Sequence, residues 1–83
     1  MYYIYAIYNR SAGKIYIGQT ENLEERLKLH NDKKFIQSYT VKFSGEWKII
    51  YKEEFETREE ALKREKQLKS FRGREFIKKY IPL

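Results

Sequence analysis

The sequence predicts an α+β fold, with a small three-stranded, mainly antiparallel sheet and flanking helices in the order β-β-α-β-α-α. Three observations lead to this prediction. Residues 2–8 and 14–18 alternate like paired strands across a glycine-containing turn, residues 46–55 are rich in aromatic and β-branched side chains, and two other segments begin with helix-capping signals. The 83 residues are expected to form one domain, 1–83, because a chain of this size buries only about 60–65% of its unfolded surface.

The first two strands are predicted to form a hairpin, with residues 9–13 (NRSAG) as its turn. Successive side chains of a strand point to opposite faces of the sheet, so each face can be assigned from the alternation. The expected core face holds Ile4, Ala6, Ile15 and Ile17, and the opposite face holds Tyr3, Tyr5, Tyr16 and Gly18. Two helices could cover or flank that opposite face, which carries several phenols beside a residue without a side chain.

A short helix is predicted over residues 23–31. Asn22, followed three residues later by Glu25, resembles a capping box, and Leu23 and Leu27 then recur at helical spacing. Residues 32–45 are mixed in character and are predicted to form a loop that could include a helical turn.

Two helices are predicted after the third strand. Thr57 and Glu60 form a second capping box, and the helix-forming run REEALKREKQLKSF (58–71) follows it. Gly73 is expected to break this helix. A last basic helix is predicted over residues 74–81, before Pro82.

One carboxylate falls on the inward face of the second predicted helix. The apolar stripe of that helix consists of Ala61, Leu62 and Leu68. At 100° per residue, Glu65 lies between Leu62 and Leu68. Burial of an unpaired carboxylate is costly, so Glu65 is either a functional residue or the partner of Lys69 or Arg58 in an ion pair.

Arg26 and His30 are four residues apart and therefore neighbours on one face of the first helix. In the structural interpretation, Arg26 pairs with surface glutamates and His30 lies near the negative end of the helix dipole. His30 is the only histidine, which argues against a multi-histidine metal site and against most histidine-relay catalysis.

The charge distribution favours a polyanionic partner. The chain has a net charge of +6, and residues 1–60 carry ten Lys/Arg and ten Asp/Glu, which cancel. Residues 61–83 carry eight Lys/Arg and two Glu, so the whole excess lies there. A basic block of this kind attracts nucleic acid, although many small proteins are basic for solubility alone.

The composition also excludes some classes of protein. Without cysteine, neither a disulfide framework nor a thiolate metal site can form. No apolar run approaches the ~20 residues of a membrane span, and the N-terminus carries no secretion signal. We therefore expect a cytoplasmic protein with no membrane partner and no small-molecule cofactor.

Taken together, these residues resemble the GIY-YIG nuclease family. The family has two tripeptides about ten residues apart on a hairpin, matched here by YIY at 3–5 and YIG at 16–18. Its arginine and histidine on the first helix match Arg26 and His30, and its glutamate on a later helix matches Glu65. The resemblance covers essentially the whole chain and is closest to small stand-alone bacterial members.

Two features depart from the family pattern. The first glycine of the family name is Tyr3 here. Some members also use an asparagine after the last helix, whereas no asparagine follows Glu65 in this chain. Any role of that residue is expected either to be missing here or to be filled by another group, such as Lys69 or Ser70.

The resemblance implies a metal-dependent endonuclease that hydrolyses phosphodiester bonds, with DNA expected as the substrate and DNA repair as one setting. Glu65 would hold Mg²⁺, or alternatively Mn²⁺, and Arg26 would stabilise the charge of the transition state. Tyr5 or Tyr16 would take the proton from the attacking water, and the family does not settle which. Tyr5 is favoured as the general base, with Tyr16 orienting water or phosphate and His30 either assisting Tyr5 or holding a phosphate oxygen. A free phenol has a pKa of about 10, so Arg26 and the metal are expected to lower the pKa of the catalytic tyrosine.

Further residues are assigned to the substrate. Phosphate contacts are predicted for Lys14, Lys69, Arg72 and Arg74. Gly18 is predicted to let backbone and substrate approach closely. The sequence does not distinguish DNA from RNA, or branched and damaged substrates from plain duplex, and it leaves the oligomeric state open.

Two other functions are compatible with the sequence. The first is a nucleic-acid-binding module of the same fold with weak or no catalysis, which would bind in a salt-sensitive and metal-independent way. The second is a protein-interaction domain that uses the aromatic side chains of Tyr2, Tyr8 and Trp47.

Overall fold

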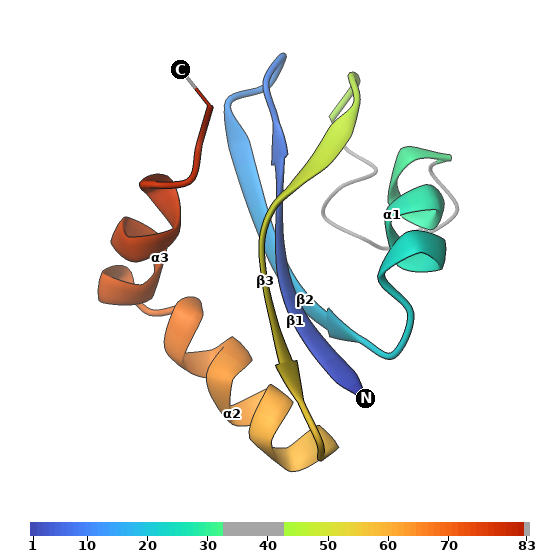
Figure 1. Ribbon diagram of the computed structural model, residues 1–83. Helices are drawn as coiled ribbons and strands as arrows, with labels where there is room; N and C mark the ends of the chain where they lie inside the picture. The colour runs from blue at the N-terminus through green and yellow to red at the C-terminus, as the bar shows by residue number, and fades with distance from the viewer. Residues whose placement is uncertain (33–42, 83) are drawn as a thin grey trace.

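The computed structural model describes residues 1–32 and 43–82 and confirms the predicted α+β architecture. The elements follow in the predicted order (Figure 1). They are β1 (Tyr2–Asn9), β2 (Lys14–Thr20), α1 (Leu23–Asn31), β3 (Trp47–Phe55), α2 (Arg58–Leu68) and α3 (Phe71–Lys78). Most of the loop predicted over residues 32–45 lies outside the described residues.

The three strands form one antiparallel sheet in the order β2-β1-β3, so β1 is the central strand and β2 is an edge. Tyr5 lies opposite Gly18 in the hairpin, and Ala6 lies opposite Ile17. Helix α1 covers one face of the sheet, and α2 and α3 cover the other (Figure 1). Two helices were expected to cover or flank the tyrosine face; among the described helices α1 covers it, whereas α2 and α3 lie on the opposite face.

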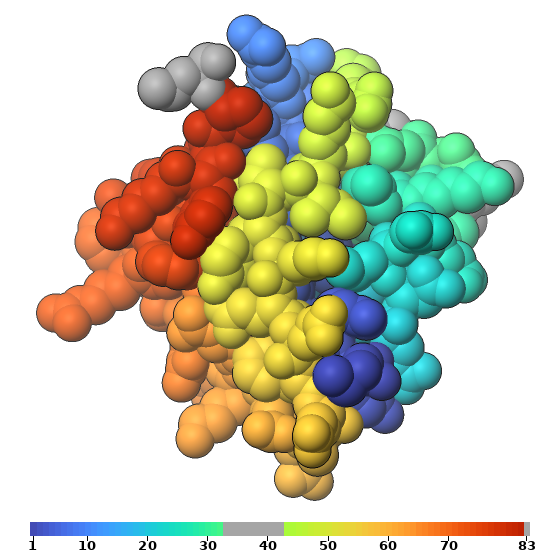
Figure 2. All heavy atoms as spheres, viewed as in Figure 1, coloured from blue at the N-terminus to red at the C-terminus, as the bar shows by residue number. Residues whose placement is uncertain are grey.

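The alternation of the strands divides the interior into two clusters. On the side of α2 and α3, the core holds Ile4, Ala6, Ile17, Ala61, Leu68 and Ile77. On the side of α1, Tyr5 and Ile7 pack with Trp47, as the period of two predicts. Figure 2 views the molecule from the side of β3, whose side chains form the surface between α1 and the two later helices. Neither face of the central strand is open to solvent, because helices cover both.

Both predicted helix caps are present. The Asn22 side chain accepts a hydrogen bond of 3.1 Å from the Glu25 amide, and the Thr57 hydroxyl accepts one of 3.2 Å from the Glu60 amide. The Thr57 hydroxyl also donates to the Glu60 carboxylate at 2.9 Å. These bonds satisfy amide donors that have no partner within their own helix.

The expected break at Gly73 is wrong. Helix α2 ends at Leu68, and Ser70 caps α3 by accepting a hydrogen bond of 3.2 Å from the Gly73 amide. Gly73 thus lies in the first turn of α3, which spans 71–78 instead of 74–81. A side chain there would overlap the backbone of Gln67 and Leu68, so the glycine permits close packing of the two helices.

The inward face of α2 also differs from the expected one. Ala61 and Leu68 are buried, but Leu62 is 42% exposed. Arg64 is half-buried instead and points back to β3, where its Nε lies 3.1 Å from both carboxylate oxygens of Glu53. Arg64 Nη2 also lies 3.0 Å from Glu53 Oε2, so this bidentate ion pair, and not Leu62, occupies the side of the helix that faces β3. No described helix is long and apolar enough to cross a membrane.

Candidate active site

The centre of the tyrosine face is a hydrogen bond between Tyr5 on β1 and His30 at the end of α1. The Tyr5 hydroxyl and His30 Nε2 lie 2.9 Å apart, and each residue is only 2% exposed. Leu23 and Leu27 pack α1 against this face and so bring His30 over the central strand. Two buried polar groups thereby satisfy each other.

The rings of the two motif tyrosines lie close to Gly18, which leaves room for them because it has no side chain. A Cβ at this position would lie 2.7 Å from the Tyr5 hydroxyl oxygen and 3.1 Å from Cε2 of Tyr16. The strand therefore needs a glycine here, because both rings cross the position that a side chain would occupy. The predicted close approach exists, but it is the approach of protein side chains; an approach by substrate stays a prediction.

Tyr16 completes a cluster of three rings. Its ring centroid lies 6.3 Å from that of Tyr5 and 5.0 Å from that of His30. Unlike Tyr5 it is only half-buried, and it stands on the edge strand β2. Of the two phenols, Tyr16 is thus the one with access to solvent.

Burial raises the pKa of the Tyr5 hydroxyl above its usual value, because the charged form would be desolvated. Tyr16 adds to this increase, the positive charge of Arg26 opposes it, and the negative charge of Glu65 raises it slightly further. Arg26 thus lowers the pKa of Tyr5, as expected, but burial outweighs its effect; a further lowering by a bound metal stays a prediction. The charges of Arg26 and Glu65 therefore act on this hydroxyl in opposite directions.

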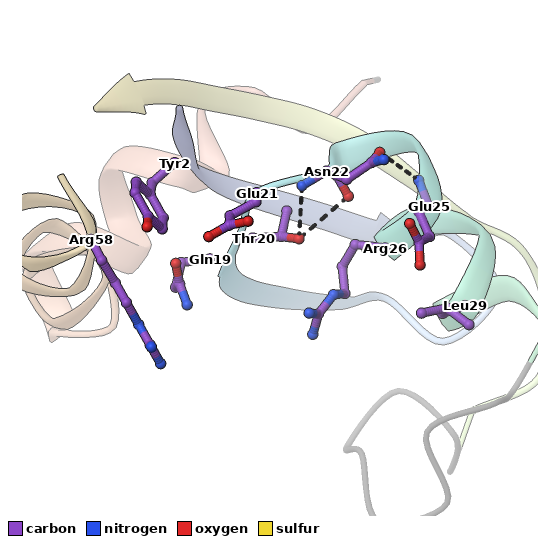
Figure 3. A pocket seen from close by; sticks show the side chains of 9 residues that line it. All are labelled: Tyr2, Gln19, Thr20, Glu21, Asn22, Glu25, Arg26, Leu29 and Arg58. Atoms are coloured by element: carbon purple, nitrogen blue, oxygen red, sulfur yellow. Dashed lines mark hydrogen bonds between the residues drawn. The ribbon is translucent and has the colours of Figure 1, made fainter. Parts of the chain in front are cut away.

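Arg26 extends from α1 into a cavity of about 340 Å³ at the C-terminal end of β2 (Figure 3). Arg58 from α2 lines the same cavity from the other side. The sequence suggested Arg58 only as an ion-pair partner for Glu65. The position of Arg58 across the cavity from Arg26 depends on how α2 packs against the sheet, and the periodicity of one helix does not reveal such packing.

Glu65 lies on α2 and is paired with Lys69. Its Oε2 is 3.1 Å from Lys69 Nζ, with the Glu65 side chain 18% exposed and the Lys69 side chain 45% exposed. One of the two structural interpretations of Glu65 is thus present in the molecule, and a role in catalysis stays a prediction. Among the described residues, no group of three or more His, Asp or Glu side chains could hold a metal ion.

A second cavity, of about 550 Å³, runs between the edge strand β2 and helices α2 and α3. Tyr16 lines it together with four cations, Lys14, Lys69, Arg74 and Lys78. Three of the four residues predicted to contact phosphate therefore lie around one groove. Arg72 is exposed on α3 and does not line it, whereas Lys78 does.

Comparison with known proteins identifies the family to which the chain belongs. The sequence pattern of the GIY-YIG catalytic domain matches residues 1–80. The chain belongs to the GIY-YIG family. The members of this family are nucleases, so the resemblance seen in the sequence is confirmed at the level of family and general activity.

Two relatives share nearly the whole GIY-YIG domain. The UPF0213 protein SSP2268 of Staphylococcus saprophyticus is 34% identical over 77 residues, which cover 93% of this chain and 90% of that protein. The solution NMR structure of the UPF0213 protein BH0048 from Bacillus halodurans has a TM-score of 0.53 at 28% identity. That match covers 93% of this chain and 82% of the other. The chain therefore spans most of the length of both relatives.

Proposed function

We propose that the protein is a metal-dependent endonuclease that hydrolyses phosphodiester bonds in DNA. One observation carries the proposal. The rings of Tyr5, Tyr16 and His30 meet above a glycine at the edge of the sheet, within reach of the charges of Arg26 and Glu65. Groups that act on one phosphate must converge on it, and these five come from four different elements.

The two tyrosines differ in what they can do. Tyr5 is buried, hydrogen-bonded and difficult to ionise, so it is poorly placed to take a proton from water. Tyr16 is half-exposed and lies between this cluster and the cationic groove. We therefore propose that the Tyr16 phenolate accepts the proton of the attacking water. Tyr5 would hold the His30 ring in place beside Tyr16.

Arg26 would stabilise the charge that develops on the phosphate. As water attacks phosphorus, a P–O bond forms and the bond to the leaving sugar oxygen breaks, while negative charge gathers on the non-bridging oxygens. A guanidinium stays charged at any physiological pH and offers a planar pair of donors to two of those oxygens. Its electrostatic effect on the Tyr5 hydroxyl and its position in the wall of the adjoining cavity support this role.

The donor set fits a weakly held, hydrated Mg²⁺ better than a tightly bound metal. Mg²⁺ in nucleases is commonly held by one or two carboxylates plus substrate phosphates, and Glu65 offers one carboxylate of this kind. Lys69 now neutralises that carboxylate and would have to turn toward the phosphate when the ion binds. When bound, the ion would polarise the phosphate and stabilise the leaving oxygen.

The groove along β2 supplies the substrate contacts. Lys14, Lys69, Arg74 and Lys78 come from β2, α2 and α3 and line one surface that ends at Tyr16. A phosphate backbone in this groove would meet cations along its length and present one phosphodiester to the ring cluster. Because these contacts are to phosphate charge, the groove would supply affinity for nucleic acid without reading its base sequence.

The alternative function is a nucleic-acid-binding module without catalysis. It is favoured by a single observation, namely that Glu65 already has a cationic partner and belongs to no group of three or more His, Asp or Glu side chains that could hold a metal among the described residues. Such a module would bind through the same groove but would not depend on a metal.

A panel of end-labelled linear, branched and single-stranded DNAs and RNAs, incubated with Mg²⁺, Mn²⁺ or EDTA, tests the proposal. We expect cleavage of DNA with either metal and none in EDTA. Binding of the same substrates in all three conditions, with no cleavage in any, would show that the protein is the binding module instead.

A further inference from the structure

The cavity between α1 and α2 contains groups that the proposed hydrolysis does not use. Its volume of about 340 Å³ falls in the range typical of small-ligand sites. Strand β2 contributes Gln19 to its wall, and Tyr2 and Arg58 come from β1 and α2 (Figure 3). Only Arg26, on its far side, also acts at the tyrosine cluster.

Gln19 is an amide at a position where the strand pattern calls for an apolar residue. The alternation that buries Ile17 and half-buries Ile15 on the side of α2 continues to Gln19. Its Oε1 is buried, and no described residue hydrogen-bonds to it. An unpartnered acceptor of this kind is destabilising, so its presence suggests that a ligand or solvent donor completes it. Rotation of the terminal amide can present either its oxygen or its NH₂ group to the cavity.

Two arginines extend on either side of this amide. In Figure 3 the side chains of Arg58 and Arg26 point toward the same open side of the cavity, with Gln19 between them. Among the described residues, Arg58 forms no ion pair. Its planar fork therefore remains available for a ligand that presents hydrogen-bond acceptors.

The cavity also carries negative charge, which decides what kind of ligand suits it. Glu21 and Glu25 line the same cavity as Arg26. A phosphate group inside the cavity would gain from the arginines but would be repelled by both carboxylates, whereas the phosphate proposed for Arg26 lies outside the cavity, at the tyrosine cluster. The edge of a nucleobase presents donors and acceptors side by side, and it can also stack on an aromatic wall such as Tyr2.

We propose that this cavity binds one unpaired nucleobase of the substrate strand, adjacent to the phosphate that Arg26 holds. The inference rests on the proposed function, and it narrows the substrate to nucleic acid with an unpaired nucleotide beside the cleaved bond. A base inside a duplex has its edge occupied by its partner and cannot enter a cavity of this kind.

The experiment compares binding with and without bases on the same backbone. The probes are a short single-stranded DNA and a chain of the same length in which every nucleotide is abasic, both measured in EDTA; an RNA of the same sequence reports any role of the sugar. Because the two DNAs carry equal phosphate charge, the ratio of their dissociation constants isolates the contribution of the bases. We expect the wild-type protein to prefer the DNA with bases by about tenfold or more.

Two variants test whether the residues of the cavity cause the preference for DNA with bases. Gln19→Met keeps the volume but removes the amide, and Arg58→Lys keeps the charge but removes the planar fork. Each should reduce the ratio severalfold, whereas the control Arg10→Lys, an exposed arginine outside the cavity, should not. Gln19→Met should also leave the melting temperature equal or higher, since it deletes an unpartnered acceptor.

A wild-type ratio near one, or a ratio that neither variant changes, would overturn the inference. These outcomes are independent of cleavage. If the protein cuts DNA but the variants leave the ratio of dissociation constants unaltered, only the nucleobase site in the cavity is contradicted. If the variants lose the ratio but the wild-type protein never cuts, only the proposed nuclease activity is contradicted.

Discussion

The phenol of Tyr5 and the imidazole of His30 form a hydrogen bond of 2.9 Å across 25 residues of chain. Both groups are buried, so the bond joins helix α1 to the central strand at a point that water does not reach. This contact explains why a motif tyrosine lies in the interior. It also separates the roles of the two motif tyrosines, since only Tyr16 remains half-exposed.

Stability at alkaline pH should depend on Tyr5. Its pKa in the folded protein is raised, whereas in the unfolded chain it is near the ordinary value of about 10. Above that pH the unfolded state loses a proton that the native state retains, so the free energy of unfolding falls as pH rises through and beyond ~10. In Tyr5→Phe, measured by urea denaturation across this range, the fall should be shallower. Tyr80, a residue that is 44% exposed, provides the control. If Tyr80→Phe makes the fall in stability equally shallow, the effect is a general one of alkaline pH and does not come from Tyr5.

Gly18→Ala should destabilise the protein by about 1–3 kcal/mol, because the new methyl group would lie 2.7 Å from the Tyr5 hydroxyl oxygen and force the ring aside. The same substitution in a Tyr5→Phe background should cost less, since the nearest atom is gone. Urea denaturation of the four proteins in this cycle measures the coupling directly. Additive effects would mean that the ring does not occupy the space above the glycine.

The two motif tyrosines should differ in kinetics. Tyr16→Phe removes the proposed general base, so we expect kcat to fall by roughly 10²–10⁴ with little change in DNA binding. Tyr5→Phe should reduce kcat less and lower stability more, since it breaks the bond to His30. Single-turnover cleavage and thermal melting on the same samples provide the comparison. The reverse order of kcat values would return the base to Tyr5.

Charge in the groove should set the salt dependence of binding. Replacing Lys14, Arg74 and Lys78 by Gln should flatten the slope of log K against log salt, by about 0.9 for each phosphate of duplex DNA that the protein no longer neutralises. The matched control replaces Lys48, Lys52 and Lys63, which are exposed cations outside both cavities. If the two triple variants behave alike, net charge and not the groove governs binding.

Much of the fold could be predicted because its signals are local. Alternation in two short strands was enough to assign Tyr5 and Ile4 to opposite faces, and capping residues located the starts of α1 and α2. Tyr16, Arg26 and Glu65 stood out because they interrupt an apolar pattern or match the spacing of the family.

The remaining features depend on packing between elements, which no single segment encodes. Gly73 resembles a helix terminator, but its role is to let α3 approach the backbone of α2. Leu62 fits the apolar stripe, yet Arg64 turns toward Glu53 and excludes it. Gln19 could not be noticed before the cavity around it was known, because an unpartnered amide is defined only by its neighbours.

Glu65→Gln tests the central claim most directly. The ion pair with Lys69 is partly exposed on one helix, so its loss should cost no more than about 0.5 kcal/mol of stability. The matched control is Glu75→Gln, which breaks the similar pair with Lys78 on α3.

The measurement is the rate of DNA cleavage in Mg²⁺ per folded molecule, with melting temperature and binding in EDTA recorded on the same preparations. The account predicts that Glu65→Gln cuts at the background rate, melts near the wild-type temperature and binds DNA equally or slightly more tightly, while Glu75→Gln cuts normally. A Glu65→Gln protein that melts early but still cuts at the wild-type rate would show that Glu65 serves only to hold Lys69.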